Sequence, residues 1–191
     1  MTTGMLPLRA HSAGPSPIRA LEATITRPGP AQLAATWRLS ADLSRLRVPA
    51  VGPVGFVAGL WEHTCFELFV RIAGSLAYFE FNLSPSRSWA AFAFSGYRAG
   101  RTPLPDLAPP TLAINKDAQA LTVESLITLP DAAFGRASPP LEVAVAAVIE
   151  DVGGTLSYWA LKHPEARPDF HHPDSFLIRL DRAASSPADA S

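Results

Sequence analysis

The chain has few of the residues that mark several common protein classes. Its 191 residues include one cysteine, Cys65, which excludes an internal disulfide framework. The net charge is −1 and there is no run of basic residues, which argues against nucleic-acid binding because phosphate recognition needs a concentrated positive surface. No apolar run approaches the roughly 18 residues that span a bilayer, so no membrane partner is expected.

The N-terminus also lacks the continuous apolar stretch of an export signal. A cytoplasmic location is therefore expected, with a truncated or tail-dependent export signal as the open alternative.

Hydrophobic residues make up 48% of the chain and charged residues 17%, which is typical of a globular protein. The length favours one domain with a full core. We predict a flexible segment over residues 1–17, a domain over 18–181 and a disordered tail over 182–191.

Apolar residues recur mostly at every second position, which indicates strands rather than helices. Only residues 130–135 suggest a helical turn. Residues 41–60 and 98–110 are rich in proline and glycine and predict irregular connections. About ten short strands with such turns predict an all-β fold, an antiparallel β-sandwich of the jelly-roll or immunoglobulin-like type, with an up-and-down barrel as the alternative. The expected strands cover residues 18–27, 32–40, 64–72, 77–83, 88–95, 112–115, 120–129, 141–150, 156–161 and 175–180.

Two of these strands form the central predicted hairpin, residues 64–72 and 77–83. A short connecting loop would pair Val70 with Phe79, and this register keeps the apolar side chains of both strands on one face. That face holds Phe66, Leu68, Val70, Phe79, Phe81 and Leu83. The opposite face then carries Cys65, Glu67, Glu80 and Asn82.

The polar face of this hairpin has two interpretations. In one, Glu67 and Glu80 are diagonal neighbours with Cα atoms roughly 7 Å apart, and with Trp61 nearby they bind a hydroxylated ligand. In the other, the face is solvated and the Glu–Arg pair formed with Arg71 contributes little. Cys65 is correspondingly a small half-buried residue or a reactive thiol.

The sequence around the predicted hairpin resembles that of a known family. The pattern Trp61-Glu62-x-x-x-Phe66-Glu67-x-Phe69, followed by Tyr78-x-Glu80-Phe81-Asn82-x-x-Pro85, is similar to that of the bacterial DOMON-like proteins, relatives of the family-nine carbohydrate-binding modules. The resemblance extends over residues 18–181 and includes the closing segment, residues 161–176.

The resemblance implies a β-sandwich that binds a sugar or, in other DOMON branches, a haem. It implies that Trp61 stacks on a pyranose ring and that Glu67 accepts hydrogen bonds from sugar hydroxyls, which suits the chemistry of both groups. The chain departs from the sugar-binding pattern in two places. Glu80 stands where those modules carry an arginine, and the second stacking tryptophan has no counterpart, since His171, His172 and Phe176 lie in its region.

The histidines of the loop over residues 162–174 leave three roles open: hydrogen bonding to the loop backbone, ligand contact or binding of a divalent metal. Their spacing matches no known metal signature. Both methionines, Met1 and Met5, lie in the expected flexible segment, so a haem would need two histidines, His63 and one from this loop. We expect no cofactor, with haem or a divalent metal as alternatives.

The predicted function is a non-catalytic module for a small hydroxylated ligand such as a sugar, because no nucleophile elbow or phosphate loop is present. A module that docks an enzyme partner, and a metal- or haem-binding redox domain, are the alternatives. Oligomeric state is left open. The predicted ligand-binding residues are Trp61, Glu67, Glu80, Asn82, Arg87, His171 and His172.

Overall fold

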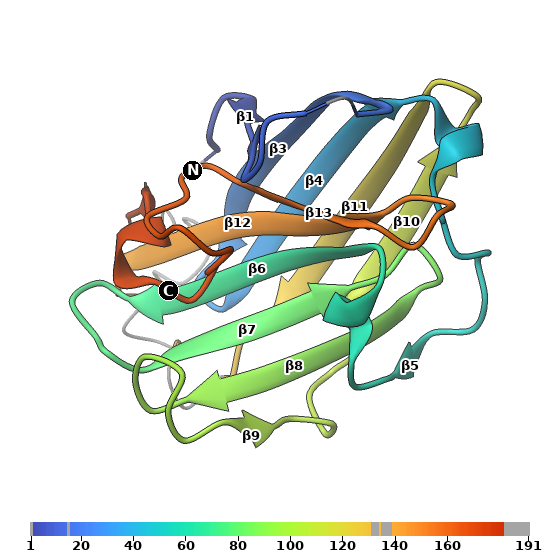
Figure 1. Cartoon of the computed structure of the whole chain (residues 1–191). Helices are drawn as coiled ribbons and strands as arrows, with labels where there is room; N and C mark the ends of the chain where they lie inside the picture. Colours follow the sequence, from blue (N-terminus) through green and yellow to red (C-terminus); the bar gives the residue numbers. More distant parts are fainter. Residues whose placement is uncertain (1, 15, 131–133, 135–138, 182–191) are drawn as a thin grey trace.

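A computed structural model of the chain describes residues 2–14, 16–130, 134 and 139–181. Two mostly antiparallel sheets lie face to face as a β-sandwich (Figure 1). A five-stranded sheet has the order β1-β3-β4-β11-β10. These strands are β1 (Leu6–Pro7), β3 (Ile18–Gly29), β4 (Gln32–Ala41), β11 (Ala120–Thr128) and β10 (Thr111–Lys116).

The second sheet is nine-stranded, with the order β2-β13-β12-β6-β7-β8-β5, and β14 and β9 pair with β12 and β8. Only β5 pairs in parallel, with β8. Its strands are β2 (Arg9–Ala10), β5 (Gly55–Phe56), β6 (Cys65–Ile72), β7 (Tyr78–Leu83), β8 (Ser88–Phe94), β9 (Thr102–Pro103), β12 (Leu141–Glu150), β13 (Leu156–Ala160) and β14 (Ile178–Leu180).

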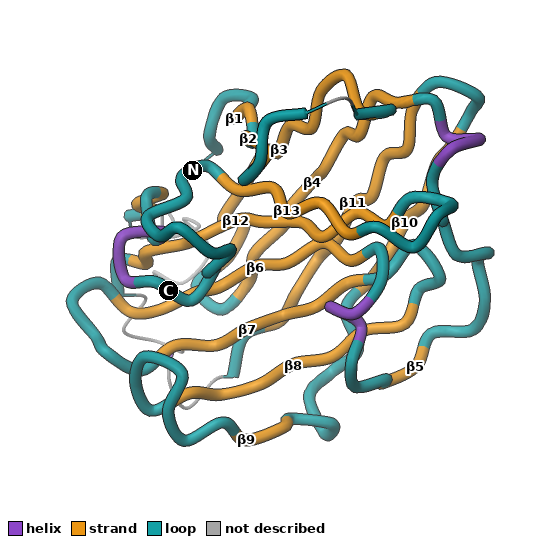
Figure 2. The backbone as a smooth tube through the Cα atoms, in the orientation of Figure 1, coloured by secondary structure: helices purple, strands orange, loops and turns teal. Residues whose placement is uncertain are grey.

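All ten predicted strands are present, with ends shifted by a few residues. The four additional strands, β1, β2, β5 and β9, have two residues each, too short for a periodic signal. Short 3₁₀ helices lie in the connections (Figure 2). They are η1 (Leu43–Arg45), η2 (Leu60–Glu62) and η3 (Pro173–Ser175). None of the helices among the described residues is long and apolar enough to cross a membrane.

The structure differs from the expected flexible segment at residues 6–10. There β1 pairs with β3 and β2 pairs with β13, so this segment joins both sheets. Leu8, between the two strands, is buried in the core, which gives the segment an apolar anchor. The predicted tail, residues 182–191, and most of the predicted helical turn over 130–135 lie outside the described residues.

The main core lies between the two sheets. Trp37 and Leu39 of the five-stranded sheet and Phe66 and Leu68 of the nine-stranded sheet are fully buried in it. A second apolar cluster covers the outer face of the nine-stranded sheet. It is formed by Phe69, Tyr78, Ala90, Phe92, Phe94, Ala144, Ala146, Val148, Ala160, Phe170 and Phe176. Strands β6 and β7 are therefore covered on both faces.

Leu68→Ala should destabilise the protein by about 2–5 kcal/mol, because it removes a fully buried side chain from the main core and leaves a cavity. Leu76→Ala is the control, since Leu76 is 77% exposed and its truncation should change stability by no more than about 0.5 kcal/mol. Urea denaturation followed by circular dichroism measures both. Equal midpoints for the two variants would contradict this packing.

Candidate functional site

The pairing of β6 with β7 determines where the two carboxylates lie. Leu68 pairs with Phe81 and Glu67 with Asn82, as the sequence predicts, and Phe69 pairs with Glu80. The apolar set of both strands faces the main core. Glu67 and Glu80 consequently project from the outer face of the nine-stranded sheet, on neighbouring strands.

The outer face is not open, which corrects the sequence interpretation. Only 3% of Glu67 and 5% of Glu80 is exposed. Two connections cover the sheet here, the one after β8 and the loop before η3, and Asp169 of that loop contacts the other connection. Oδ1 of Asp169 lies 2.8 Å from Nη2 of Arg98, and its Oδ2 accepts a 2.5 Å hydrogen bond from the Tyr97 hydroxyl. Arg98 itself has a positive φ of 52°, a backbone conformation that is uncommon outside glycine.

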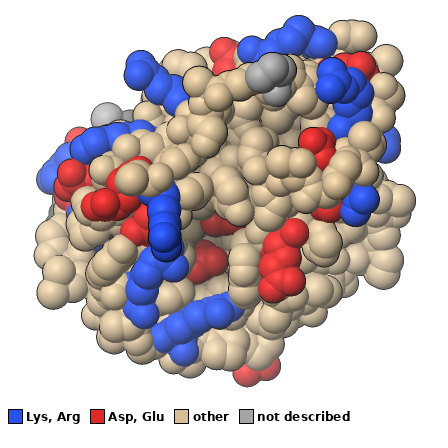
Figure 3. Space-filling view, viewed as in Figure 1, with Lys and Arg blue, Asp and Glu red and all other residues tan. Residues whose placement is uncertain are grey.

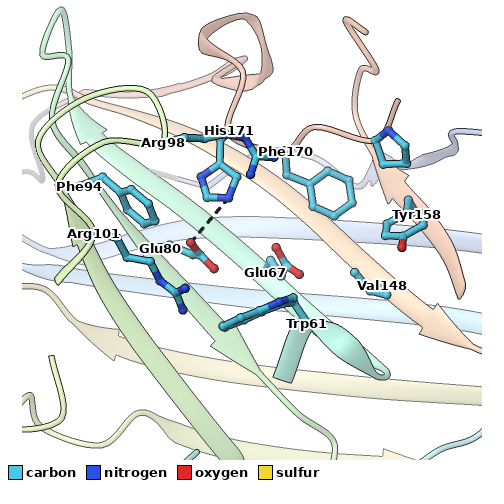
Figure 4. A pocket seen from close by; sticks show the side chains of 11 residues that line it. Trp61, Glu67, Glu80, Phe94, Arg98, Arg101, Val148, Tyr158, Phe170 and His171 are labelled. Carbon is cyan, nitrogen blue, oxygen red and sulfur yellow. Dashed lines mark ion pairs between the residues drawn. The ribbon is translucent and has the colours of Figure 1, made fainter. Parts of the chain in front are cut away.

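Beneath these connections lies a cavity of about 350 Å³ (Figure 4). Its volume is near the lower end of the range of small-molecule pockets, roughly 300–1,000 Å³. Acidic side chains are visible at the bottom of a hollow on this side of the molecule, with basic side chains beside it (Figure 3). The lining residues are Trp61, Glu67, Glu80, Phe94, Arg98, Arg101, Val148, Tyr158, Pro168, Phe170 and His171.

Four of the seven predicted ligand-binding residues line this cavity: Trp61, Glu67, Glu80 and His171. Trp61 comes from η2, the glutamates from adjacent strands and His171 from the loop before η3. Figure 4 shows both glutamates between the Trp61 ring and the imidazole.

The other three predicted residues do not line the cavity. Asn82 is fully buried beneath it, and its Nδ2 donates a 2.5 Å hydrogen bond to Oε1 of Glu80. Arg87 lies in the β7–β8 turn, where its backbone N–H donates to the Ser84 carbonyl. His172 caps η3, with Nδ1 accepting from the Asp174 N–H. The alternation that placed Glu67 gives no information on residues in turns, which explains why the last two lie away from the cavity.

Sequence reasoning missed two arginines at the cavity, Arg98 and Arg101. The guanidinium carbon of Arg101 lies 4.6 Å from the ring centroid of Trp61 and 4.0 Å from that of Phe92, in the corner between the two rings. Arg101 makes no hydrogen bond or ion pair within 4 Å among the described residues. Both arginines belong to the proline-rich connection, whose path across the sheet no periodicity reveals.

A chain of polar contacts leads to Glu80. The Arg98 backbone N–H donates to the Tyr78 hydroxyl at 3.2 Å, and that hydroxyl lies 2.8 Å from Nδ1 of His171. Nε2 of His171 lies 3.8 Å from Oε2 of Glu80, the contact dashed in Figure 4. When the Tyr78 hydroxyl donates to Nδ1, the imidazole proton is on Nε2 and faces Glu80.

Burial changes the ionisation of these groups. It lowers the pKa of His171 to about 4, with Arg98 adding repulsion, so the imidazole is neutral near pH 7. It raises the pKa of Tyr78 to about 12, which keeps the hydroxyl protonated. The pKa of Glu80 is raised by burial, although the hydrogen bond from Asn82 and the charge of Arg101 oppose that rise.

Glu67 differs from Glu80 because it lacks such donors. Its Oε1 is buried without a hydrogen-bond partner. Burial first, and the negative charge of Glu80 second, raise the pKa of Glu67 well above its ordinary value. Burial likewise raises the pKa of the Cys65 thiol, which is fully buried and donates to Oδ1 of Asn82 at 3.7 Å. The structure thus favours an unreactive thiol at Cys65.

The residues named for the metal and haem alternatives can each be located in the structure. No group of three or more His, Cys, Asp or Glu side chains is arranged to hold a metal in the part of the chain that the structure describes. His63 does not line the cavity, and its Nδ1 lies 2.8 Å from Oε2 of Glu150.

No protein-family model and no curated protein matches the sequence. The structure is similar to that of a putative carbohydrate-binding protein from Bacteroides uniformis, with a TM-score of 0.59 and 15% identity over 91% of this chain and 84% of that chain. It is also similar to a family-nine carbohydrate-binding module from Caldicellulosiruptor kristjanssonii in complex with glucose. There the TM-score is 0.51 and the identity 8%, over 95% of this chain and 86% of that chain. At these identities, the likeness establishes a shared β-sandwich fold.

The buried Glu67 predicts a specific dependence of stability on pH. Because its folded-state pKa is raised, its contribution to stability is full below its unfolded value of about 4.5 and is lost as pH rises through the folded pKa. Each pKa unit between the folded and unfolded states corresponds to about 1.4 kcal/mol. Glu67→Gln should therefore be stabilised relative to the native protein at pH 8, and the difference should shrink at pH 5.

Thermal or urea unfolding at several pH values measures this difference. His171, whose lowered pKa removes stability as pH falls below about 6.5, is present in both proteins and cancels. Glu62→Gln, an exposed carboxyl of the same η2 helix that holds Trp61, is the control and should parallel the native curve. A constant offset between Glu67→Gln and the native protein at every pH would show that Glu67 ionises normally.

Proposed function

We propose that this protein binds a small, neutral, hydroxylated ligand, a sugar of about one pyranose ring, in the cavity under Trp61. The observation that carries the proposal is Oε1 of Glu67, a buried polar atom with no hydrogen-bond partner among the described residues. A buried unsatisfied carboxyl oxygen costs about 1–3 kcal/mol or more, and a ligand hydroxyl at the cavity floor would satisfy it. The cavity volume of about 350 Å³ suits one such ring.

The wall of the cavity supports a ligand with both apolar and polar faces. Trp61 and Phe94 offer aromatic surfaces on which the C–H face of a pyranose packs. Arg101 has no acid partner within 4 Å among the described residues, so its N–H groups are available to ligand hydroxyls at the rim. A polar floor opposite aromatic walls is the usual arrangement for orienting a small ligand.

The charges of the cavity favour a neutral ligand over an anion. Arg98 is paired with Asp169, and Arg101 faces the charge of Glu80. Burial and the charge of Glu80 raise the pKa of Glu67, which favours the uncharged form of its carboxyl group. A ligand carboxylate or phosphate would add a negative charge beside Glu80 in a site of low dielectric, which is unfavourable.

The fold adds support of a coarser kind. It is shared with a family-nine module whose structure contains glucose. The Trp61, Glu67, Glu80 and Asn82 pattern supports the further proposal that the chain is a DOMON-like relative of those modules. Its bacterial origin and cytoplasmic location remain part of that proposal.

Titration with D-glucose, D-galactose, D-mannose and D-xylose tests the function by calorimetry and tryptophan fluorescence. At least one should bind and change the fluorescence, although Trp37, Trp89 and Trp159 also emit and are buried. Trp61→Phe should remove the fluorescence change. Trp61→Ala should weaken binding by about 1–3 kcal/mol, because it removes the stacking surface.

The matched control is Glu62→Gln, which changes an exposed carboxyl next to Trp61 and should leave the affinity unchanged. Circular dichroism establishes that each variant is folded. Absence of binding by all four sugars to a folded protein would refute the proposal. Binding that survives Trp61→Ala unchanged would place the sugar elsewhere.

A further inference from the structure

The two carboxyl groups of the cavity floor are in different hydrogen-bonding environments. Oε1 of Glu80 accepts from Asn82 at 2.5 Å, and its Oε2 faces Nε2 of the neutral His171 at 3.8 Å. Arg101 adds a positive charge beside Glu80. Oε1 of Glu67 has no donor among the residues that the structure describes, which favours Glu67 over Glu80 as the holder of a proton shared by the pair. The pKa shifts agree with this assignment. Burial raises the pKa of both carboxyl groups, and a hydrogen bond opposes the rise for Glu80 but not for Glu67.

This environment favours the carboxylic acid form of Glu67 and the carboxylate form of Glu80. Two carboxyl groups that differ in this way are the usual equipment for general acid and general base catalysis. Of the two glutamates, Glu80 has the polar contacts with protein side chains: the hydrogen bond from Asn82, and His171, which is itself held by the Tyr78 hydroxyl. Binding of a hydroxylated ligand requires neither the proton on Glu67 nor these contacts.

The relative position of the acid and the base restricts the reaction. Glu67 and Glu80 project from adjacent strands on the same face, so both reach a ligand from the same side (Figure 4). Hydrolysis of a glycosidic bond needs carboxyl groups that flank the sugar across the scissile bond. Acid and base side by side instead suit a proton exchange at two oxygens bonded to one carbon. In a reducing pyranose, the ring oxygen and the anomeric hydroxyl are such a pair.

We propose that this cavity interconverts the α and β anomers of a reducing pyranose, with Glu67 as the general acid and Glu80 as the general base. The proposal rests on the sugar-binding function and goes beyond it. It also departs from the non-catalytic role expected from the sequence.

The reaction needs no co-reactant. Glu80 takes the proton of the anomeric hydroxyl, and that O–H electron pair forms the carbonyl bond to the anomeric carbon. The bond from this carbon to the ring oxygen breaks, and its electron pair accepts the proton of Glu67. After rotation about the bond between the anomeric carbon and its neighbour, the ring oxygen attacks the other carbonyl face and its proton returns to Glu67. The carbonyl electron pair takes the proton from Glu80 to re-form the anomeric hydroxyl, so both carboxyl groups regain their starting states.

Other cavity residues have positioning roles in this scheme. His171 directs its Nε2 toward Glu80, because the Tyr78 hydroxyl engages Nδ1, and it thereby orients the base. Arg98 stabilises negative charge on either glutamate, and Arg101 stabilises negative charge on Glu80. Trp61, Phe94 and Phe170 form apolar walls that limit water around the open-chain form.

The test follows the optical rotation of freshly dissolved α-D-glucose, with α-D-galactose and α-D-xylose as further probes, in the presence of the purified protein. The native protein should accelerate the approach to anomeric equilibrium. Glu67→Gln and Glu80→Gln should each reduce the acceleration by about 100-fold or more, the usual contribution of a general acid or base. Glu124→Gln, an exposed carboxyl on the five-stranded sheet, should leave it unchanged.

A pH profile adds a measurement that a merely structural role would not affect. The rate should fall as pH rises through the ionisation of Glu67 and as pH falls through the protonation of Glu80. Arg98 acts on both groups, whereas Arg101 and His171 face Glu80. The profile of Glu67→Gln should lose the limb at high pH.

Calorimetry on the same samples separates the two proposals. Sugar binding without acceleration beyond that of Glu67→Gln would overturn the anomerase activity and leave the binding function intact. Acceleration that persists fully in both glutamine variants would also overturn it. Failure of these three sugars to react, together with absence of binding by all four sugars of the titration, would overturn both proposals.

Discussion

The pairing of β6 with β7 is the constraint on which the site depends. A shift of one residue would exchange the faces of a strand, sending its glutamate into the main core and its phenylalanine into the cavity. Leu68 and Phe81 prevent this shift, because both are buried between the sheets. The apolar core thus determines the position of two side chains that would be costly to bury anywhere else. The register of β6 and β7 therefore determines both the packing of the core and the geometry of the candidate site.

The cost of burying Glu80 is offset by contacts that come from distant parts of the chain. Asn82 donates from the same strand, whereas His171 arrives from the loop before η3. The Arg98–Asp169 pair fastens that loop to the connection after β8. Glu67 receives no comparable help from the protein. This asymmetry is difficult to explain as a requirement of folding, because glutamine at position 67 would avoid the charge at similar volume, and it therefore points to the cavity.

The sequence allowed the strands and the central register to be predicted because alternation depends on local residues. Phe66, Leu68 and Val70 identify one face without any knowledge of the partner sheet, and the register followed from matching two such faces. The same alternation identified Glu67 and Glu80. It could not show that Phe92, Phe94 and Phe170 form a second apolar layer over that face, because the layer combines a strand with a distant loop.

Arg98 and Arg101 illustrate the other limit of sequence reasoning. Their connection contains prolines that exclude a regular strand, and no period relates an irregular segment to the sheet that it crosses. Arg87 and His172 were selected for their charge and their neighbours, yet both are engaged in turns. In a β-sandwich, the alternation of side chains along each strand determines which residues point outward from a sheet. The positions of loop residues depend instead on tertiary contacts such as that of Arg98 with Asp169.

The relation between fold and site in this protein follows from that distinction. The two similar structures, at 15% and 8% identity, share the sandwich with this chain. A sandwich specifies where a sheet face lies, and it does not specify which side chains enclose that face. Here the enclosure comes from η2 and two connections, which supply Trp61, Arg101 and His171. Ligand chemistry in this chain is consequently determined by the residues that cover β6 and β7 and by the raised pKa of Glu67 beneath them.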